Sequence, residues 1–193
     1  MNIINSIQNC RIWGKKISGT VGFVPTMGAL HDGHISLIKK SKLVCDNTVV
    51  SIYVNPLQFS PNEDFYSYPK TMETDLNILK RLKIDMVFLP SDSIMYPLDF
   101  STFVNETILS KVLEGNSRPK FFEGVATVVI KLFNIIDPTH VFFGQKDAQQ
   151  LLIIKKIIKD LAFNIELIAC PIIRDKNGLA LSSRNQYLSD KDK

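Results

Sequence analysis

The sequence predicts an α/β protein with an open parallel β-sheet and helices on both of its faces. Two observations carry this prediction. Short apolar runs alternate with segments whose apolar residues recur at helical spacing, which is typical of successive β-α-β units. Residues 47–54 are apolar almost throughout, as expected of a strand that is covered on both sides.

The elements follow from these patterns in chain order. We expect strands at residues 20–24, 47–54, 86–89, 139–143 and 165–173. Apolar residues at helical spacing predict helices at residues 33–45, 71–83, 123–136 and 146–162, and Pro138 ends the third of them. Asp175-Lys-Asn-Gly178 predicts a tight turn after the last strand.

Composition restricts the class of protein. The chain has 193 residues, 45% of them hydrophobic and 22% charged, which suits one sizeable core. No apolar run approaches the ~20 residues of a membrane-spanning helix, and the N-terminus does not resemble a signal peptide, so we expect a cytoplasmic protein that does not bind membranes. The net charge of +4 suits an anionic ligand, but the basic residues are dispersed, which argues against nucleic acid. Cys10, Cys45 and Cys170 lack metal or disulfide spacing and are predicted to be reduced, buried thiols.

Polar clusters follow four of the expected strands, at residues 25–34, 55–59, 144–147 and 173–184. The carboxyl ends of parallel strands lie along one edge of a sheet, where open α/β folds bind their ligands. We therefore expect these four clusters to meet in one crevice.

Two of the three histidines, His31 and His34, lie in the first cluster beside Gly28 and Gly33. The N-terminus of a helix attracts phosphate, glycines permit close approach, and each imidazole can donate a hydrogen bond to a phosphate oxygen. The alternative is that His31 and His34 have no functional role. For His140, we favour the interpretation that it has no such role. No Cys, Asp or Glu at a recognisable spacing completes a metal site with the pair. Phosphate-loop, dinucleotide and nucleophile-elbow motifs are absent from the sequence.

Five ordered blocks carry a resemblance to a known family. Pro-Thr-Met-Gly-Ala-Leu-His-Asp-Gly-His at 25–34 resembles the His-x-Gly-His signature of adenylyl-transferring Rossmann-like enzymes, in the form found in the pantoate–β-alanine ligase family. Further blocks of that family are similar to Asn-Pro-Leu-Gln-Phe at 55–59, Glu63-Asp64 with Tyr68-Pro69, Gly-Gln-Lys-Asp-Ala-Gln-Gln at 144–150, and Leu-Ser-Ser-Arg-Asn at 181–185.

The resemblance implies a Rossmann-like fold of the His-x-Gly-His adenylyltransferase type and an ATP-dependent ligase. In such an enzyme a pantoate carboxylate attacks the α-phosphate of Mg-ATP and releases pyrophosphate. The amine of β-alanine then attacks the pantoyl adenylate and releases AMP, so the substrates are ATP, pantoate and β-alanine, with Mg²⁺ as the metal ion. Members of the family are usually homodimers.

The resemblance also implies roles for individual residues. His34, His31 and Lys146 are the catalytic candidates, with His34 as a hydrogen-bond donor to phosphate as charge moves onto the leaving pyrophosphate. Gln58 and Gln150 match positions that hold pantoate, and Gln58 also lies near the β-alanine site. The residues that match ATP-binding positions are Met27, Gly28, Ala29, Leu30, His31, Asp32, Gly33, His34, Gly144, Gln145, Lys146, Asp147, Ile173, Leu181, Ser182, Ser183 and Arg184. The Mg²⁺ ligands stay unassigned, with Asp64, Glu73 and Asp75 as candidates.

Two features depart from the family pattern. Lys120 and Phe121 replace a glycine and a histidine in the block that begins at Arg118, which leaves the shape of that loop open. Family members also carry a smaller C-terminal domain that closes over the nucleotide. Ser189, followed by an acidic stretch, resembles the start of a helix, so we expect one domain at 1–188 and the start of an absent C-terminal domain at 189–193.

Two other functions remain open at this point. One is a different His-x-Gly-His nucleotidylyltransferase, which would join AMP to a phosphorylated cofactor precursor but gives no reason for Gln58 and Gln150. The other is a nucleotide-binding module that is inactive without its C-terminal domain.

Overall fold

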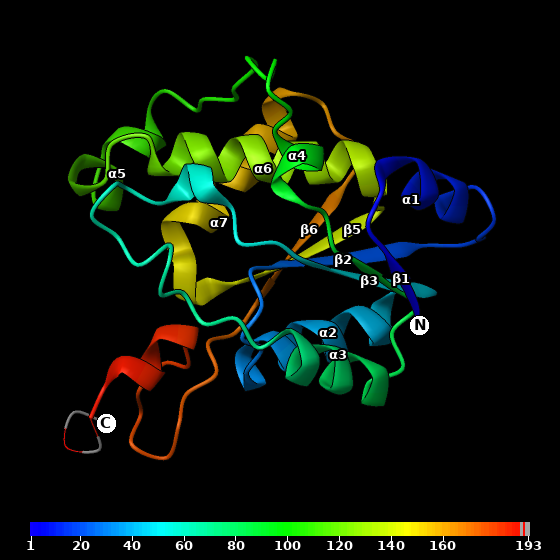
Figure 1. Cartoon of the computed structure of the whole chain (residues 1–193), viewed down its shortest axis with the longest axis horizontal. Coiled ribbons are helices and arrows are strands. Elements are labelled where there is room, and N and C mark those ends of the chain that lie inside the picture. Colours follow the sequence, from blue (N-terminus) through cyan, green and yellow to red (C-terminus); the bar gives the residue numbers. More distant parts are fainter. Residues whose placement is uncertain (190, 192–193) are drawn as a thin grey trace.

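The computed structural model describes residues 1–189 and 191, and its centre is a six-stranded sheet in the order β1-β4-β3-β2-β5-β6 (Figure 1). Every pairing between neighbouring strands is parallel, which confirms the predicted fold class. The strands are β1 (Asn2–Ile4), β2 (Val21–Thr26), β3 (Asn47–Ile52), β4 (Met86–Phe88), β5 (His140–Gly144) and β6 (Glu166–Cys170).

Helices cover both faces of this sheet (Figure 1). One face carries α2 (Asp32–Val44) and α3 (Met72–Arg81), and the other carries α1 (Ile7–Gly14), α6 (Phe121–Ile136) and α7 (Ala148–Asp160). The shorter elements are the helices α4 (Asp92–Met95) and α5 (Glu114–Ser117) and the 3₁₀ turns η1 (Pro56–Gln58), η2 (Leu109–Lys111), η3 (Gln145–Asp147) and η4 (Ser183–Tyr187).

Two hydrophobic cores result, one on each face of the sheet. Phe23 of β2 packs toward α6 and α7, whereas its neighbour Val24 packs toward α2 and α3, because successive side chains of a strand point to opposite faces. Val49 and Val50 of β3 divide in the same way, and all four side chains are fully buried. This double burial explains why the central strands are apolar runs without alternation.

Most element boundaries lie within two residues of the sequence-based prediction, and three differences have a clear structural reason. The helix expected from residue 146 begins at Ala148, because residues 145–147 form the 3₁₀ turn η3. The strand expected to reach residue 173 ends at Cys170. The edge strand β1 and the following helix α1 were not predicted, since three residues are too few to show a period and β1 is defined by its pairing with β4.

The segment after β6 forms a short hairpin around the tight turn that was expected at residues 175–178. Arg174 and Ala180 make an antiparallel bridge, and the N–H of Gly178 donates to the carbonyl of Asp175 at 3.1 Å, which confirms the tight turn. The expected start of a second domain at residues 189–193 falls largely outside the described residues, which exclude 190, 192 and 193.

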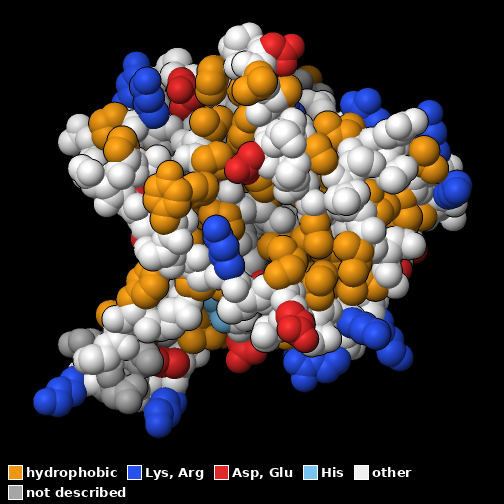
Figure 2. Space-filling model, viewed as in Figure 1, with side chains coloured by type: hydrophobic (Ala, Val, Ile, Leu, Met, Phe, Trp, Pro, Cys, Tyr) orange, Lys and Arg blue, Asp and Glu red, His pale blue; other side chains and the backbone are white. Residues whose placement is uncertain are grey.

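Two further expectations concern the whole chain. Cys10, Cys45 and Cys170 are free and buried, as predicted. Within residues 1–189 and 191, no helix is long and apolar enough to cross a bilayer. On the face shown in Figure 2, Lys and Arg side chains lie mostly around the outline and do not form one patch.

The order of the strands fixes where a ligand can bind. From β2 the chain runs through α2 to β3 and through α3 to β4, and it then crosses by α6 to β5 on the other side of β2. This reversal opens a crevice at the carboxyl ends of β2 and β5, which is the usual binding position in open α/β sheets.

Candidate active site

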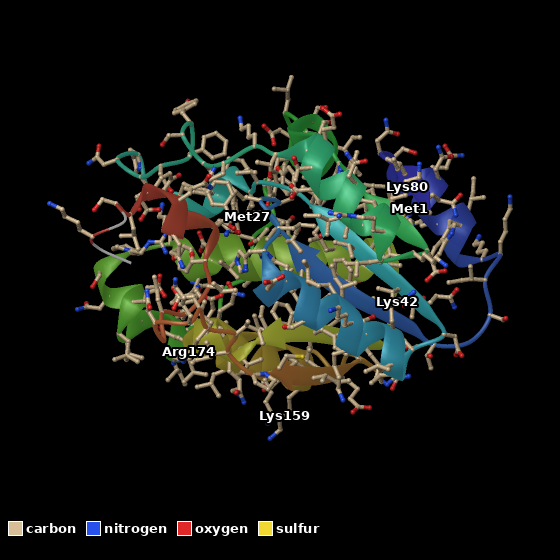
Figure 3. The ribbon with its side chains drawn as sticks, turned by 90° about the horizontal axis from the view of Figure 1, so that it is seen from below. Met1, Met27, Lys42, Lys80, Lys159 and Arg174 are labelled. Atoms are coloured by element: carbon tan, nitrogen blue, oxygen red, sulfur yellow. The ribbon has the colours of Figure 1, made fainter. Side chains whose placement is uncertain are left out.

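A pocket lies at this crevice and collects residues from the ends of four strands. Its lining includes Thr26 at the end of β2, Asn55 after β3, Gly144 at the end of β5 and Ile172 after β6. The four polar clusters therefore meet in one place, as the sequence predicted. Figure 3 shows Met27, another lining residue, near the centre of the molecule, whereas Lys159 lies at its lower border (Figure 3).

The two histidines of the first cluster cap the helix α2 with their rings. His31 is the N-cap residue, and its Nδ1 accepts a hydrogen bond from the N–H of Gly33 at 3.1 Å. Nδ1 of His34 accepts from the N–H of His31 at 3.3 Å. The rings lie against each other with their centroids 4.1 Å apart. Because a backbone N–H can only donate, both Nδ1 atoms are unprotonated, and each neutral ring carries its proton on Nε2.

The electrostatics of the pocket keep these rings neutral. Burial, with smaller contributions from His31 and Lys146, lowers the pKa of His34 to about 3. Burial also lowers the pKa of His31, with Lys146 as the next cause. At neutral pH both side chains are therefore neutral Nε2–H donors, suited to hydrogen bonding with phosphate oxygens rather than to donating a proton.

Gly33 lines the pocket and leaves the room that the ring of His31 occupies. A Cβ atom at this position would lie 2.7 Å from Cε1 and 2.9 Å from Nδ1 of His31. Any larger residue would push the His31 ring away from the helix terminus that it caps.

Three cations lie near the pair or on the rim of the pocket. Lys146 forms an ion pair with Asp147 at 2.8 Å, and its charge reaches both histidines. Arg184 donates to both carboxylate oxygens of Asp64, at 2.8 and 2.7 Å, and its guanidinium lies over the rings of Phe59 and Tyr68.

The third cation, Arg118, belongs to the segment that departs from the family pattern. It donates to both oxygens of Glu63 at 2.6 Å and to Glu114 at 2.7 Å. Phe121 lies beneath its guanidinium at 3.6 Å from the ring centroid, and Lys120 takes a left-handed backbone conformation with φ of 70°. In this chain the two substituted residues thus shape the wall that holds Arg118.

The two glutamines line the same pocket, and a network of amides orients the first of them. Oε1 of Gln58 accepts from Nδ2 of Asn55 at 3.1 Å, and Nε2 of Gln58 points to the sulfur of Met27 at 3.0 Å. Asn55 is 1% exposed, and its Oδ1 accepts from the hydroxyl of Tyr96 at 2.7 Å. Gln150 approaches from the first turn of α7.

Not every residue named from the sequence faces this pocket. Gly28, Ala29, Leu30, Asp32 and Gln145 are not among the lining residues. The named residues that do line it are Met27, His31, Gly33, His34, Gln58, Gly144, Lys146, Asp147, Gln150, Ile173, Leu181, Ser182, Ser183 and Arg184.

Several lining residues were missed. Asn55 belonged to a block that pointed to the site, but its role depends on contacts that are distant in sequence. In the sequence, the apolar residues of α6 have the spacing expected of a helix that packs against a core. In the structure, most of them also line one wall of the pocket. The missed residues of this wall are Val125, Val128, Val129 and Leu132.

The three acidic candidates for Mg²⁺ do not gather in the structure. Asp64 is held by Arg184, and the carboxylate of Asp75 accepts hydrogen bonds from the backbone N–H groups of Ala29 and Leu30. Glu73 lies exposed on α3. Within the described part of the chain, no group of three His, Cys, Asp or Glu side chains is arranged to hold a metal ion.

Comparison with known proteins decides the family. The family described as pantoate-beta-alanine ligase matches residues 2–193 of the chain. The chain belongs to the pantoate-beta-alanine ligase family. A pantothenate synthetase of Thermosipho africanus is 51% identical over 196 residues, which cover 100% of this chain and 70% of that protein. One from Caldicellulosiruptor saccharolyticus is 54% identical over 175 residues, or 91% of this chain and 62% of the relative.

Solved structures of the family agree with this fold along the whole chain. A pantothenate synthetase from Thermus thermophilus superimposes with a TM-score of 0.94 at 41% identity, covering 99% of this chain and 69% of that one. The pantoate-beta-alanine ligase of Francisella tularensis, solved in complex with beta-gamma ATP and beta-alanine, gives a TM-score of 0.95 at 43% identity, covering 100% and 75%. The chain thus spans between 62% and 75% of the length of these relatives.

Proposed function

We propose that this chain joins pantoate to β-alanine at the expense of ATP, through a pantoyl adenylate, and releases AMP and pyrophosphate. Family membership supports this reaction, as do the names of the relatives and the beta-gamma ATP and β-alanine held by one of them. The observation that carries the proposal is one pocket that joins a phosphate-type site, with His31, His34 and Lys146, to two amide side chains, Gln58 and Gln150.

In the first half-reaction, an oxygen of the pantoate carboxylate attacks the α-phosphorus of ATP while the bond to the β-phosphate oxygen breaks. Negative charge moves onto the leaving pyrophosphate. The Nε2–H groups of His31 and His34 donate hydrogen bonds to phosphate oxygens, and Lys146 adds a full positive charge beside them. Fixed donors aimed at developing charge need little reorganisation during the reaction, which is how such groups accelerate it.

The roles proposed for the other residues follow from their positions around the pocket. Gln58 and Gln150 hold pantoate, and Gln58 also faces β-alanine. The nucleotide contacts Gly144, Asp147, Ile173 and the segment 181–184. When it binds, Arg184 leaves its ion pair with Asp64 and binds a phosphate group instead. In the second half-reaction, the amine of β-alanine attacks the acyl carbon of the adenylate and AMP leaves. Positioning supplies most of the rate in both steps.

Mg²⁺ enters this proposal as part of the substrate Mg-ATP. The described residues provide no ready-made group of ligands. This fits an ion held mainly by phosphate oxygens and water, as Mg²⁺ commonly is at nucleotide sites. When bound, the ion neutralises phosphate charge.

Three further parts of the proposal concern the whole protein. We propose a homodimer, by analogy with the family, which light scattering in solution would test. A cytoplasmic location is consistent with three free, buried thiols. A first domain at 1–188, followed by a second domain, agrees with the greater length of the relatives.

The decisive experiment measures pyrophosphate release with Mg-ATP, with and without pantoate, before β-alanine is added. Release that requires pantoate would support the first half-reaction and exclude a nucleotidylyltransferase for another acceptor. ATP binding without pyrophosphate release would instead favour a binding module that lacks activity in this form.

A further inference from the structure

Asp75 is a buried carboxylate that the proposed reaction does not use. It lies in the first turn of α3, is 1% exposed, and is absent from the pocket lining. Its Oδ2 accepts from the N–H of Ala29 at 2.9 Å, and its Oδ1 accepts from the N–H of Leu30 at 2.8 Å. The hydroxyl of Thr71 donates to Oδ2 at 3.1 Å. Because α3 lies beside α2 on the same face of the sheet (Figure 1), this carboxylate sits behind the turn that leads from β2 into α2.

The turn that Asp75 holds has an unusual backbone. Gly28 and Ala29 follow each other with φ of 85° and 50°. Ala29 is the informative residue, because a side chain makes this left-handed conformation unfavourable. Such a residue persists when its surroundings hold it. Here the carboxylate of Asp75 binds its N–H from one side, and the hydroxyl of Ser183 donates to its carbonyl at 3.1 Å.

The hydrogen bonds of the turn also decide what it can offer a ligand. The N–H of Gly28 donates to the hydroxyl of Thr26 at 3.2 Å, those of Ala29 and Leu30 donate to Asp75, and that of His31 donates to His34. All four backbone donors from 28 to 31 are therefore already in use. The groups that this turn can present to phosphate are the imidazole Nε2–H groups at its end, and their position depends on the path of the backbone before them.

We propose that Asp75 is a positioning residue for the phosphate site. Its carboxylate holds the left-handed turn at Ala29 and so sets where His31 and His34 place their Nε2–H groups. Asp75 acts through these two rings and does not touch the nucleotide. This inference rests on the proposed function for its kinetic test, but a second test by NMR is independent of activity.

The kinetic test compares Asp75→Asn with Asp99→Asn. Both remove one charge at nearly constant volume, and Asp99 is an exposed aspartate after α4. An asparagine at 75 presents an NH₂ group where a carboxylate oxygen accepted, so one N–H of the turn loses its acceptor. We expect pyrophosphate release to fall by ~10²-fold, as for a misplaced reacting group, with the KM for pantoate within about two-fold of the parent. Asp99→Asn should behave like the parent.

Two additions separate positioning from other roles. In the Asp75→Asn background, Ala29→Gly should restore part of the rate, because glycine adopts the left-handed conformation without a steric cost. A loss confined to thermal stability, with a normal rate for the folded protein, would overturn the proposal. Recovery of the rate at high Mg²⁺ would also overturn it, since Asp75 would then be a metal ligand.

The NMR test follows the imidazole ¹⁵N signals of the three histidines. In Asp75→Asn we expect the signals of His31 and His34 to move while those of His140 stay, and unchanged signals for all three would contradict the proposal. If the parent itself releases no pyrophosphate with pantoate, the proposed function fails, but this spectrum still tests the role of Asp75. If Asp75→Asn does not fold, Thr71→Val serves instead, since it removes only the hydroxyl that anchors the carboxylate.

Discussion

Nδ1 of His34 accepts a hydrogen bond from the backbone N–H of His31, and this contact fixes the tautomer of His34. The acceptor nitrogen cannot carry a proton, so Nε2 must carry the one proton of a neutral ring. With its pKa lowered to about 3 by burial, His34 stays neutral throughout the physiological range. The ring therefore stabilises phosphate charge as a neutral hydrogen-bond donor.

The first prediction concerns this tautomer. Between roughly pH 5 and 8, well above the lowered pKa of His34, the ring should show a protonated Nε2 and an unprotonated Nδ1 in ¹H–¹⁵N long-range NMR spectra. A titration of the His34 signals with a midpoint near 6.5, the usual value for histidine, would show that the ring is free to protonate and would remove the argument for a fixed tautomer.

The second prediction concerns catalysis. His34→Ala should lower adenylate formation by ~10²-fold or more, the range for loss of one well-placed charge-stabilising donor. Pyrophosphate release with Mg-ATP and pantoate measures this step. His140→Ala is the matched control, because His140 is the first residue of β5 and lies at the amino ends of the strands, away from the pocket. Its Nε2 lies 3.4 Å from a carboxylate oxygen of Glu166. A near-normal rate for His34→Ala would remove this residue from the mechanism.

The third prediction follows from the pH dependence of folding. The pKa of His34 is about 3 in the folded chain and 6.5 in the reference state, so as pH falls below 6.5 the unfolded chain binds a proton that the folded chain resists. His34 therefore costs stability increasingly from pH 6.5 toward 3. His34→Gln keeps an acceptor but cannot protonate, so urea unfolding should show a smaller loss of stability between roughly pH 7 and 5 than in the parent. Parallel losses in the two proteins would contradict the assignment.

The fourth prediction separates the two substrates. Gln58→Ala or Gln150→Ala should weaken pantoate far more than ATP, because each removes a pocket-lining amide that the proposed function assigns to pantoate. Titration calorimetry with each ligand measures the two affinities. Gln8→Ala, an exposed glutamine of α1, is the control and should change neither. Equal losses for both ligands would contradict this division of the pocket.

The fifth prediction tests how α6 places Gln58. A Cβ at Gly124 would lie 2.1 Å from the carbonyl oxygen of Leu57, and the carbonyl of Gly124 accepts from Asn55 at 3.1 Å. Gly124→Ala should therefore displace η1, weaken pantoate and cost ~1–3 kcal/mol of stability, as overpacking does. Gly14→Ala has open space around its Cβ and should be nearly neutral in urea unfolding. Normal pantoate binding by Gly124→Ala would show that η1 tolerates the shift.

Particular residues show how far the sequence could be read. The apolar runs of β2 and β3 and the stripe of α6 predicted the parallel sheet, because burial on both faces leaves a local pattern. The histidine pair was found because its rarity and its glycines are visible in a short stretch of sequence. Asn55 and Arg118 were not given roles, because their partners Tyr96 and Glu63 are 41 and 55 residues away.

Local patterns in the sequence were sufficient for the order of the main strands and helices, the family, and the edge of the sheet where the ligand site lies. These depend on hydrophobic period and on short motifs, which are local properties of the chain. Three outcomes needed the folded chain: which nitrogen of each imidazole carries the proton, that Asp75 holds the turn before them, and that Gly28 to Leu30 lie behind the site. The proton positions depend on hydrogen bonds within residues 31–34, which form only once the chain takes up the start of α2. The other two outcomes depend on hydrogen bonds between α3 and the turn and on burial, which arise only when segments distant in sequence pack together.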